Sequence, residues 1–344
     1  MTWKQRIAGM INRLLAPLGV QVCRGLPWSA SLIETLNACP GYPYLKECEE
    51  GIRGGRFPIF VPYPVEARPR YGHGLPPHGG VRSILSANKD AYRTQLEQFL
   101  PLTDRLQQIP VTSEDDPESP CWSNPWFTGL DLVALYGFIA LTRPRLYLEI
   151  GSGWSTKTAR RAIADHGLAT RITSIDPQPR AAIDHLADTV IRRRLEDVAL
   201  DVFDSLQPGD ILFFDGSHRC FMNSDVTVFF LEVLPRIPPG VLIHIHDIHM
   251  PSDYPPCRAL HYESEQYVLA AMLLHGMTRF DVVLPNRFVL DDNGLRDILR
   301  PLWDIVGECV GRKGTSFWMR KRADGPGPSG ADATRGGHTT QERH

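Results

Sequence analysis

Acidic and histidine side chains follow apolar runs at four places in the chain, and their types and spacing could support chemistry. In chain order these residues are Glu149 with Gly151 and Gly153, then Asp176, then Asp215 with His218, and last His246 with Asp247. In an open α/β sheet, ligands bind at the carboxyl ends of the strands. We therefore expect the side chains of the last two groups to converge beside one bound ligand.

The segment from Glu149 to Gly153 is a glycine turn between an apolar strand and a helix. Its glycines would let a ligand approach the backbone closely. A dinucleotide fingerprint would have a third glycine at position 156, where this chain has Thr156. The carboxylate of Glu149 suits the cationic amino and sulfonium groups of S-adenosylmethionine better than a pyrophosphate. The turn therefore favours that cofactor, and a carboxylate that caps a nearby helix is the alternative role for Glu149.

Asp176 ends the second expected strand and is followed by Pro177. An acidic residue at this place can accept hydrogen bonds from both hydroxyls of a cofactor ribose. A cap for the turn ahead of Pro177 is the alternative. We expect the ribose role because a strand comes directly before the aspartate.

Short apolar runs alternate with helical stretches from residue 145 onward. Strands are expected at 146–150, 172–175, 190–193, 210–214, 241–245, 279–284 and 315–320. Helices are expected at 125–141, 155–165, 180–186, 198–206, 221–234, 264–274 and 295–309. Apolar strands separated by helices predict a parallel sheet that is covered on both faces. The expected fold class is therefore α/β, a doubly wound, mainly parallel, Rossmann-like sheet of seven strands with an irregular and helical N-terminal extension.

Three parts of the chain differ in composition. Residues 1–109 are expected to form the extension, irregular and rich in Pro and Gly at 25–86 and helical at 88–108. Residues 110–322 are expected to form the cofactor-binding domain. Residues 323–344 carry no large apolar side chain and are expected to be disordered.

Charge and cysteine content exclude several classes of protein. The chain has 344 residues with 37 basic and 39 acidic side chains. This balance gives no indication of a nucleic-acid partner, because such proteins usually show a basic excess. Seven cysteines without a CxxC pair argue against a zinc module and against a disulfide scaffold.

No apolar run is long enough to cross a membrane, so we expect a cytoplasmic protein. Residues 1–16 have helical apolar spacing with Lys4, Arg6 and Arg13 on the other positions. A helix packed on the body of the protein explains this pattern, and contact with a membrane surface is the alternative. Homo-oligomerisation is compatible with the sequence.

The motif order ExGxG, IDP, DGSH and HD resembles that of class I S-adenosylmethionine-dependent methyltransferases. Over residues 146–320 the chain is similar to bacterial metal-assisted O-methyltransferases that act on sugar hydroxyls in macrolide tailoring. The resemblance implies methyl transfer to a hydroxyl oxygen of a small molecule or glycan. It implies cofactor contacts from Glu149, Gly151, Ser152 and Gly153 to the methionine part, from Asp176 to the ribose, and from Glu196 and Asp197 to the adenine.

The resemblance also implies catalytic roles for the last two motifs. Asp215 and Asp247 would bind a divalent metal, Mg²⁺ by analogy, and His218 would act as the base. His246 stands where related enzymes often carry a second carboxylate, and it is expected as a further metal ligand although Mg²⁺ prefers oxygen. The metal would stabilise a developing alkoxide while His218 removes the proton near neutral pH. A hydrogen-bonded structural histidine is the alternative role for His218.

Three other functions fit parts of the same pattern. These are a nicotinamide-dependent oxidoreductase, a cofactor-binding scaffold without catalysis, and a hydroxylase with a metal held by His218, His246 and Asp247. The joint presence of Asp215, His218 and Asp247 argues against the scaffold. Candidates for the wall of the acceptor pocket, with core packing as the alternative for the aromatic ones, are Trp126, Phe127, Tyr136, Tyr254, Glu265, Gln266 and Tyr267.

Overall fold

The computed structural model describes residues 66–112, 116–179, 182–276, 279–307, 310 and 313–323. All but the first of them belong to one compact unit that begins at Ala67. The helix expected at 1–16, most of the irregular stretch and nearly all of the tail lie outside the described residues. Within the described part, no helix is long and apolar enough to cross a membrane.

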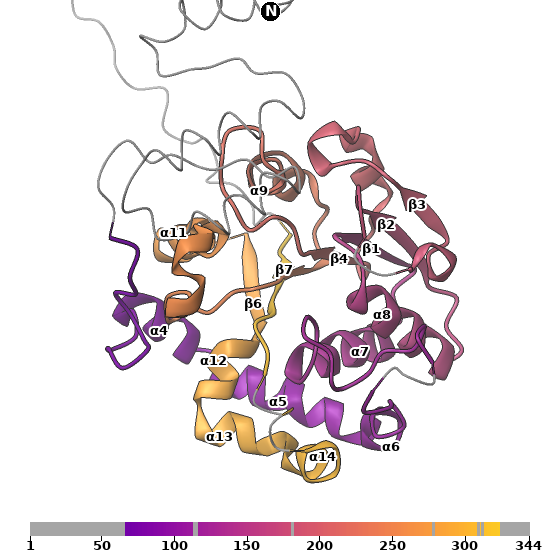
Figure 1. Cartoon of the computed structure of the whole chain (residues 1–344), viewed down its shortest axis with the longest axis horizontal. Coiled ribbons are helices and arrows are strands. Elements are labelled where there is room, and N and C mark those ends of the chain that lie inside the picture. The colour runs from indigo at the N-terminus through magenta and orange to yellow at the C-terminus, as the bar shows by residue number, and fades with distance from the viewer. Residues whose placement is uncertain are drawn as a thin grey trace, which may run out of the picture. The chain divides into compact units, whose positions relative to one another are not determined.

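A seven-stranded sheet forms the centre of this unit, in the order β3-β2-β1-β4-β5-β7-β6 (Figure 1). Its strands are β1 Leu146–Ile150, β2 Arg171–Ile175, β3 Thr189–Ile191, β4 Ile211–Phe214, β5 Leu242–Ile245, β6 Phe280–Pro285 and β7 Phe317–Lys321. Strands β1 to β5 pair in parallel, and β7 runs antiparallel to β5 and β6. The expected fold class, a mainly parallel seven-stranded α/β sheet, is confirmed.

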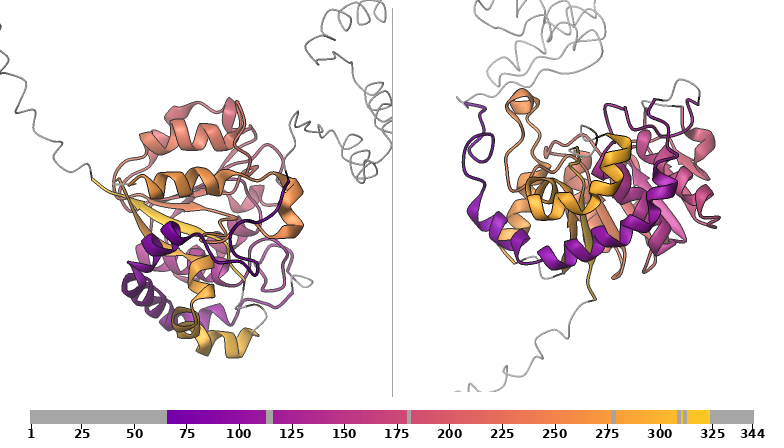
Figure 2. Two further views of the ribbon diagram at one scale, coloured as in Figure 1. Left: turned by 90° about the vertical axis from the view of Figure 1, so that its left-hand side faces the viewer. Right: turned by 90° about the horizontal axis from the view of Figure 1, so that it is seen from below.

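Helices lie on both sides of the sheet (Figure 2). They are α4 Gly79–Ser86, α5 Lys89–Phe99, α6 Thr103–Leu106, α7 Leu130–Thr142, α8 Trp154–Asp165, α9 Asp225–Val228, α10 Leu234–Arg236, α11 Glu265–Leu274, α12 Asn286–Asp291, α13 Asn293–Arg296 and α14 Arg300–Val306. Helix α4 lies in the stretch that the sequence indicated to be irregular. The side chain of His78 caps it by accepting a hydrogen bond of 3.3 Å from the Val81 amide.

Three expected helices have another form in the structure. Of the helix expected at 180–186, the described part holds a 3-10 turn at Asp184–Leu186. The stretch expected at 198–206 is a 3-10 helix at Leu200–Ser205. The helix expected at 221–234 begins later, at Asp225, and passes through a π-helical turn at Phe229–Val233 into α10. The wide turn coincides with two apolar contacts, since Phe229 stacks on Phe214 at 4.0 Å and lies edge-on to Phe230.

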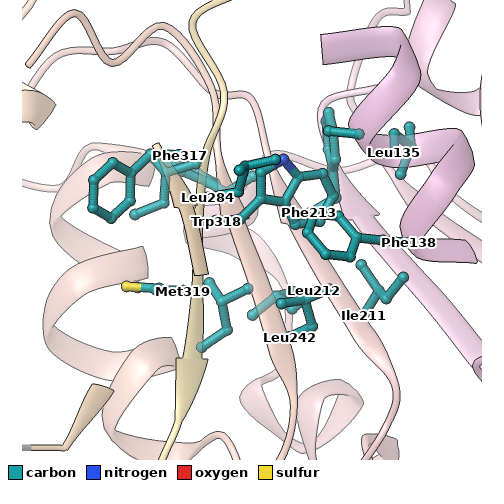
Figure 3. Packing of buried hydrophobic residues seen from close by; sticks show 14 of the residues in the cluster. Leu135, Phe138, Ile211, Leu212, Phe213, Leu242, Leu284, Phe317, Trp318 and Met319 are labelled. Carbon is teal, nitrogen blue, oxygen red and sulfur yellow. The ribbon is translucent and has the colours of Figure 1, made fainter. Parts of the chain in front are cut away.

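The core lies between the sheet and α7, a helix that is buried along nearly its whole length. Figure 3 shows Phe138 of α7 beside Phe213 of β4 and Trp318 of β7. The rings of Phe138 and Trp318 are 4.6 Å apart between centroids. Strands β1, β4 and β5 are fully buried because both their edges and both their faces are covered. This packing fixes the carboxyl ends of the three strands at a common edge.

Helix α5, which precedes residue 110, packs on the same unit as the sheet. Phe99 of α5 contacts Phe138 of α7 at 5.4 Å between ring centroids, and Tyr92 contacts Phe288 of α12 at 6.1 Å. The division into an extension, a cofactor-binding domain and a tail stays a prediction.

Candidate active site

The turns after β1 and β4 lie in backbone contact at the carboxyl edge of the sheet. Gly151 has a φ of +80°, and a Cβ placed on it would lie 1.9 Å from the backbone oxygen of Asp215. Only glycine fits there, for reasons of both space and backbone conformation. The contact brings the glycine turn directly beside the segment that carries Asp215 and His218.

Glu149 is the penultimate residue of β1, and its side chain is fully buried. Its carboxylate accepts hydrogen bonds from the hydroxyls of Thr156 at 2.5 Å, Tyr147 at 3.1 Å and Ser155 at 3.2 Å. Burial raises the pKa of Glu149 to about 7, although these three hydroxyls oppose the shift. Glu149 thus contacts the first turn of α8 through the side-chain hydroxyls of Ser155 and Thr156. A direct contact with a cofactor stays a prediction.

The glycine turn is tied to the end of β2 through Asp176. One oxygen of the Asp176 carboxylate accepts from the Ser152 amide at 2.8 Å and from the Ser152 hydroxyl at 3.1 Å. The other accepts from the Gln178 amide at 2.8 Å. A Cβ placed on Gly153 would meet no atom of the described residues within 4 Å. The structure therefore brings Gly151, Ser152, Gly153 and Asp176 together, with open space at Gly153.

Glu196 and Asp197 lie on the 3-10 turn Leu195–Asp197 after β3. Asp197 is exposed and pairs with Arg194 at 2.9 Å, and Glu196 is half-buried. Arg192, at the end of β3, donates to the backbone oxygen of Asp176 at 2.9 Å and so links this region to the ribose candidate. The adenine contacts of Glu196 and Asp197 stay a prediction.

His218 lies among three carboxylates. Its Nδ1 is 2.6 Å from Glu265 Oε1, and its Nε2 is 3.5 Å from Asp215 Oδ1 and 3.3 Å from Asp247 Oδ2. Burial alone would lower the pKa of His218, but Glu265 above all, then Asp215 and Asp247, raise it to about 10. Carboxylate oxygens thus face both ring nitrogens and favour the imidazolium form.

Asp247 pairs with a second cation besides His218. Its Oδ2 accepts from Arg258 at 2.6 Å, and its Oδ1 accepts from the Thr315 hydroxyl at 3.2 Å. The same Arg258 donates to Glu263 at 2.7 Å. Burial alone would raise the pKa of Asp247, but His246, Arg258 and His218 hold it well below its usual range.

His244 and His246 belong to β5 and the residue after it, and both are buried. His244 stacks on Phe213 at 3.9 Å between centroids and its Nε2 lies 2.7 Å from the Ser316 hydroxyl. The ring of His246 faces the backbone oxygen of Trp126, with Nε2 at 3.3 Å. Burial alone would lower the pKa of His246, but nearby aspartates, Asp215 first, raise it.

The donor set does not fit the divalent metal expected at Asp215, His246 and Asp247. Within the described residues, no three His, Cys, Asp or Glu side chains are grouped so that they could hold a metal ion. His246 lies against Trp126, and Asp247 is bonded by Arg258. The Nε2 of His218 lies between the two aspartates. Cationic side chains thus already neutralise the carboxylates that a metal would need.

The other residues of this cluster had only weak signals in the sequence. Glu265 was a candidate for the acceptor pocket, whereas its buried carboxylate contacts His218. Arg258 comes from the 3-10 turn Pro256–His261, a stretch without any motif. Asp131 could have been recognised from the sequence as an unusual residue, because it is the one acidic residue in the apolar helix α7. Its carboxylate accepts from the amides of Thr315 and Ser316 and so anchors the chain ahead of β7.

Part of the chain is similar to a known protein family. A family model described as "Methyltransferase domain" matches residues 148–248, which contain the glycine turn, Asp176 and the whole His218–Asp247 region. No curated protein matches the chain in sequence.

Several solved structures are similar to the chain at low identity. An O-methyltransferase from Bacillus cereus in complex with SAH is 18% identical, with 67% of this chain and 91% of that chain covered and a TM-score of 0.34. SAH-bound Podospora anserina methyltransferase PaMTH1 is 14% identical, with coverage of 74% and 100% and a TM-score of 0.34. Plantazolicin methyltransferase BpumL, with a monoazolic desmethylPZN analog and SAH, is 10% identical, with coverage of 70% and 100% and a TM-score of 0.36. Similarity at this level does not indicate an acceptor.

Proposed function

Because the chain is a methyltransferase of the class I, S-adenosylmethionine-dependent type, we propose that it methylates a hydroxyl oxygen of a small molecule or glycan. One observation carries the proposal. The backbone of Gly151 lies against Asp215, so a group for proton exchange, His218, stands beside the turn expected to hold the methyl donor. A hydroxyl is the acceptor that most needs such a group, because it is a poor nucleophile until it loses its proton.

The residues at the glycine turn fit the cofactor. S-adenosylmethionine, when bound, supplies a methyl group on a positively charged sulfur. The half-buried carboxylate of Asp176 would hold the ribose, and the open space at Gly153 would admit the methionine part. Glu149 would keep the turn in shape through the Ser155 and Thr156 hydroxyls.

His218 is proposed as the base in its neutral form. The carboxylates around it favour the imidazolium, so the ring must first release the Nε2 proton to solvent, which its partly exposed side chain reaches. It does so more readily when a second positive charge lies at the glycine turn, because like charges repel. Nε2 then accepts the proton of the hydroxyl, and Asp215 and Asp247 stabilise the imidazolium that forms. No metal takes part in this proposal, since Arg258 pairs with Asp247 whether or not His218 carries a proton.

Transfer of labelled methyl groups tests the proposal. Purified protein is incubated with methyl-tritiated S-adenosylmethionine and a panel of a sugar, an aliphatic alcohol, a catechol, an amine and a carboxylic acid. Label should appear on hydroxyl acceptors with the wild type and be lost in His218→Ala, while calorimetry shows that His218→Ala still binds S-adenosylhomocysteine. Label on the amine or the acid alone would refute hydroxyl methylation.

A further inference from the structure

We propose that Glu265 is the positioning residue for His218 and that the turn Ser264–Tyr267, at the start of α11, holds the two loops that form the site. This inference rests on the proposed function for its chemical meaning, but its geometry stands independently. The turn contacts the loop after β4 on one side and the loop after β5 on the other.

The side-chain contact is a buried ion pair. Glu265 is 0% exposed and His218 lies 2.6 Å from its Oε1. Its Oε2 has no hydrogen-bond partner among the residues that the structure describes. A buried carboxylate oxygen without a partner is costly. Such pairs contribute little net stability, so the orientation that this contact gives the His218 ring is its better explanation.

The backbone of His218 is held by the same turn. His218 has a φ of +64°, in the left-handed region that residues other than glycine rarely adopt. Its backbone oxygen accepts from the Ser264 amide at 2.7 Å, and the Ser264 hydroxyl accepts from the Cys220 amide at 2.8 Å. The strained conformation is therefore fixed from outside the loop, as is typical of functional positions.

The next two residues of the turn hold the loop after β5. The side-chain oxygen of Gln266 accepts from the His249 amide at 2.9 Å, and the hydroxyl of Tyr267 donates to Asp253 at 3.0 Å. His249 is two residues beyond Asp247, so the position of the second aspartate at His218 depends on the same element. One helical turn thus sets the distance between the two loops.

Because Glu265 contacts the Nδ1 of His218, only the Nε2 of the ring is left to exchange a proton with the acceptor. With Nδ1–H donated to Glu265, only Nε2 faces the edge formed by Asp215 and Asp247. The partner of one ring nitrogen determines the tautomer and the direction of the other. Glu265 therefore keeps His218 aimed at the place expected for the acceptor hydroxyl.

The test compares Glu265→Gln with the matched control Glu263→Gln in the full chain. Glu263 is also buried and also pairs with a cation, but that cation is Arg258. Nitrogen-15 and proton NMR of the histidine rings detects the Nδ1 proton of a short charge-assisted bond as a strongly downfield resonance. Calorimetry with S-adenosylhomocysteine and the thermal midpoint Tm are measured on the same samples.

We expect the downfield Nδ1 resonance in the wild type and in Glu263→Gln, and its loss in Glu265→Gln. Affinity for S-adenosylhomocysteine should be unchanged in Glu265→Gln, and Tm should fall only modestly, because Asp215 and Asp247 still face His218. Turnover should fall about 10- to 100-fold with KM for S-adenosylmethionine unchanged, and Glu265→Asp should recover part of it. The recovery distinguishes a positioning carboxylate from a packing residue.

Two results separate this inference from the proposed function. If Glu265→Gln keeps the resonance, or methylates hydroxyls at the wild-type rate, the inference is wrong and the function stands. If the resonance depends on Glu265 but the wild type labels no hydroxyl acceptor, the positioning contact stands and the proposed function is wrong. A parallel loss of Tm and of cofactor affinity in both Glu265 variants would show a purely structural role and overturn the inference.

Discussion

The α-carbon of Gly151 faces the backbone oxygen of Asp215 so closely that a Cβ would lie 1.9 Å from it. The opposing group is main chain and cannot rotate away. Gly151→Ala should therefore destabilise the fold by about 1–3 kcal/mol or more, because both the contact and the φ of +80° oppose a side chain. It should also weaken binding of S-adenosylhomocysteine, because the turn must move.

Gly79→Ala is the matched control for that change. Gly79 begins α4, and a Cβ there would meet no described atom within 4 Å. Alanine should leave stability unchanged or raise it by about 0.5 kcal/mol. Urea unfolding measures both variants. Equal stability of the two would show that the Gly151–Asp215 contact is looser than described.

Asp176→Ala should weaken S-adenosylhomocysteine binding. The carboxylate anchors the Ser152 amide and hydroxyl and is the ribose candidate, so two sources of affinity are lost together. Hydrogen bonds to a charged group contribute about 1.5–3 kcal/mol, which corresponds to roughly a 10- to 100-fold weaker Kd. Calorimetry measures it, with Asp197→Ala as a comparison for the exposed carboxylate after β3. An unchanged Kd in Asp176→Ala would remove Asp176 from the site.

The sequence predicted most of the sheet because buried parallel strands are continuous apolar runs. The bounds of β1 agree with the expectation, and the other strands lie within a few residues of theirs. The helices were harder, since propensity does not reveal a π-helical turn. Burial of Phe229 and Phe230 together and the proline after Leu234 shape that segment.

The candidate site was predictable as far as the chain itself brings residues to strand ends. Asp215, His218 and Asp247 meet as expected, because they follow the carboxyl ends of the neighbouring strands β4 and β5. Glu265 and Arg258 reach His218 and Asp247 from turns without a motif, and no local pattern indicates such contacts. The direction of the Glu149 side chain was also not readable, because three hydroxyls from β1 and α8 compete for it.

The kcat/KM for S-adenosylmethionine should rise with pH between neutrality and about 10, because this constant reports the titration of the enzyme without bound cofactor. His218 must be neutral to accept a proton, and the surrounding carboxylates raise its pKa to about 10. Below that value the neutral fraction grows tenfold with each pH unit. An aliphatic alcohol is the right acceptor because its own hydroxyl does not titrate in this range. Any residual activity of His218→Ala should not rise with pH over this range. A wild-type rate that falls over the range would exclude His218 as the base.

Chelation should not abolish activity. The Oδ2 of Asp247 is bonded by Arg258, and His218 lies between Asp215 and Asp247, so positive charge is supplied by side chains. We expect equal turnover before and after dialysis against EDTA, and no increase on addition of Mg²⁺. Arg258→Met should in contrast leave Asp247 underpaired and lower turnover. Loss of activity with EDTA and its return with Mg²⁺ would reinstate the metal.

Acid should destabilise the fold in part through His244. The ring is buried in β5 against Phe213, and burial, followed by the neighbouring His246, lowers the pKa of His244 well below 6.5. The unfolded chain therefore binds a proton that the folded chain excludes. Stability from this group is complete above about 6.5 and is lost as the pH falls toward the depressed folded value.

His244→Leu isolates this contribution. At pH 7 the variant should be less stable by about 1 kcal/mol, because the hydrogen bond with Ser316 is lost. As the pH falls below 6.5, the gap should narrow and then reverse, since leucine has no proton to exclude. Other acid-sensitive groups, such as the buried His249, are present in both proteins and cancel in the comparison. Urea unfolding at several pH values measures the gap, and a gap that stays constant would mean that the ring of His244 is not held neutral by its burial.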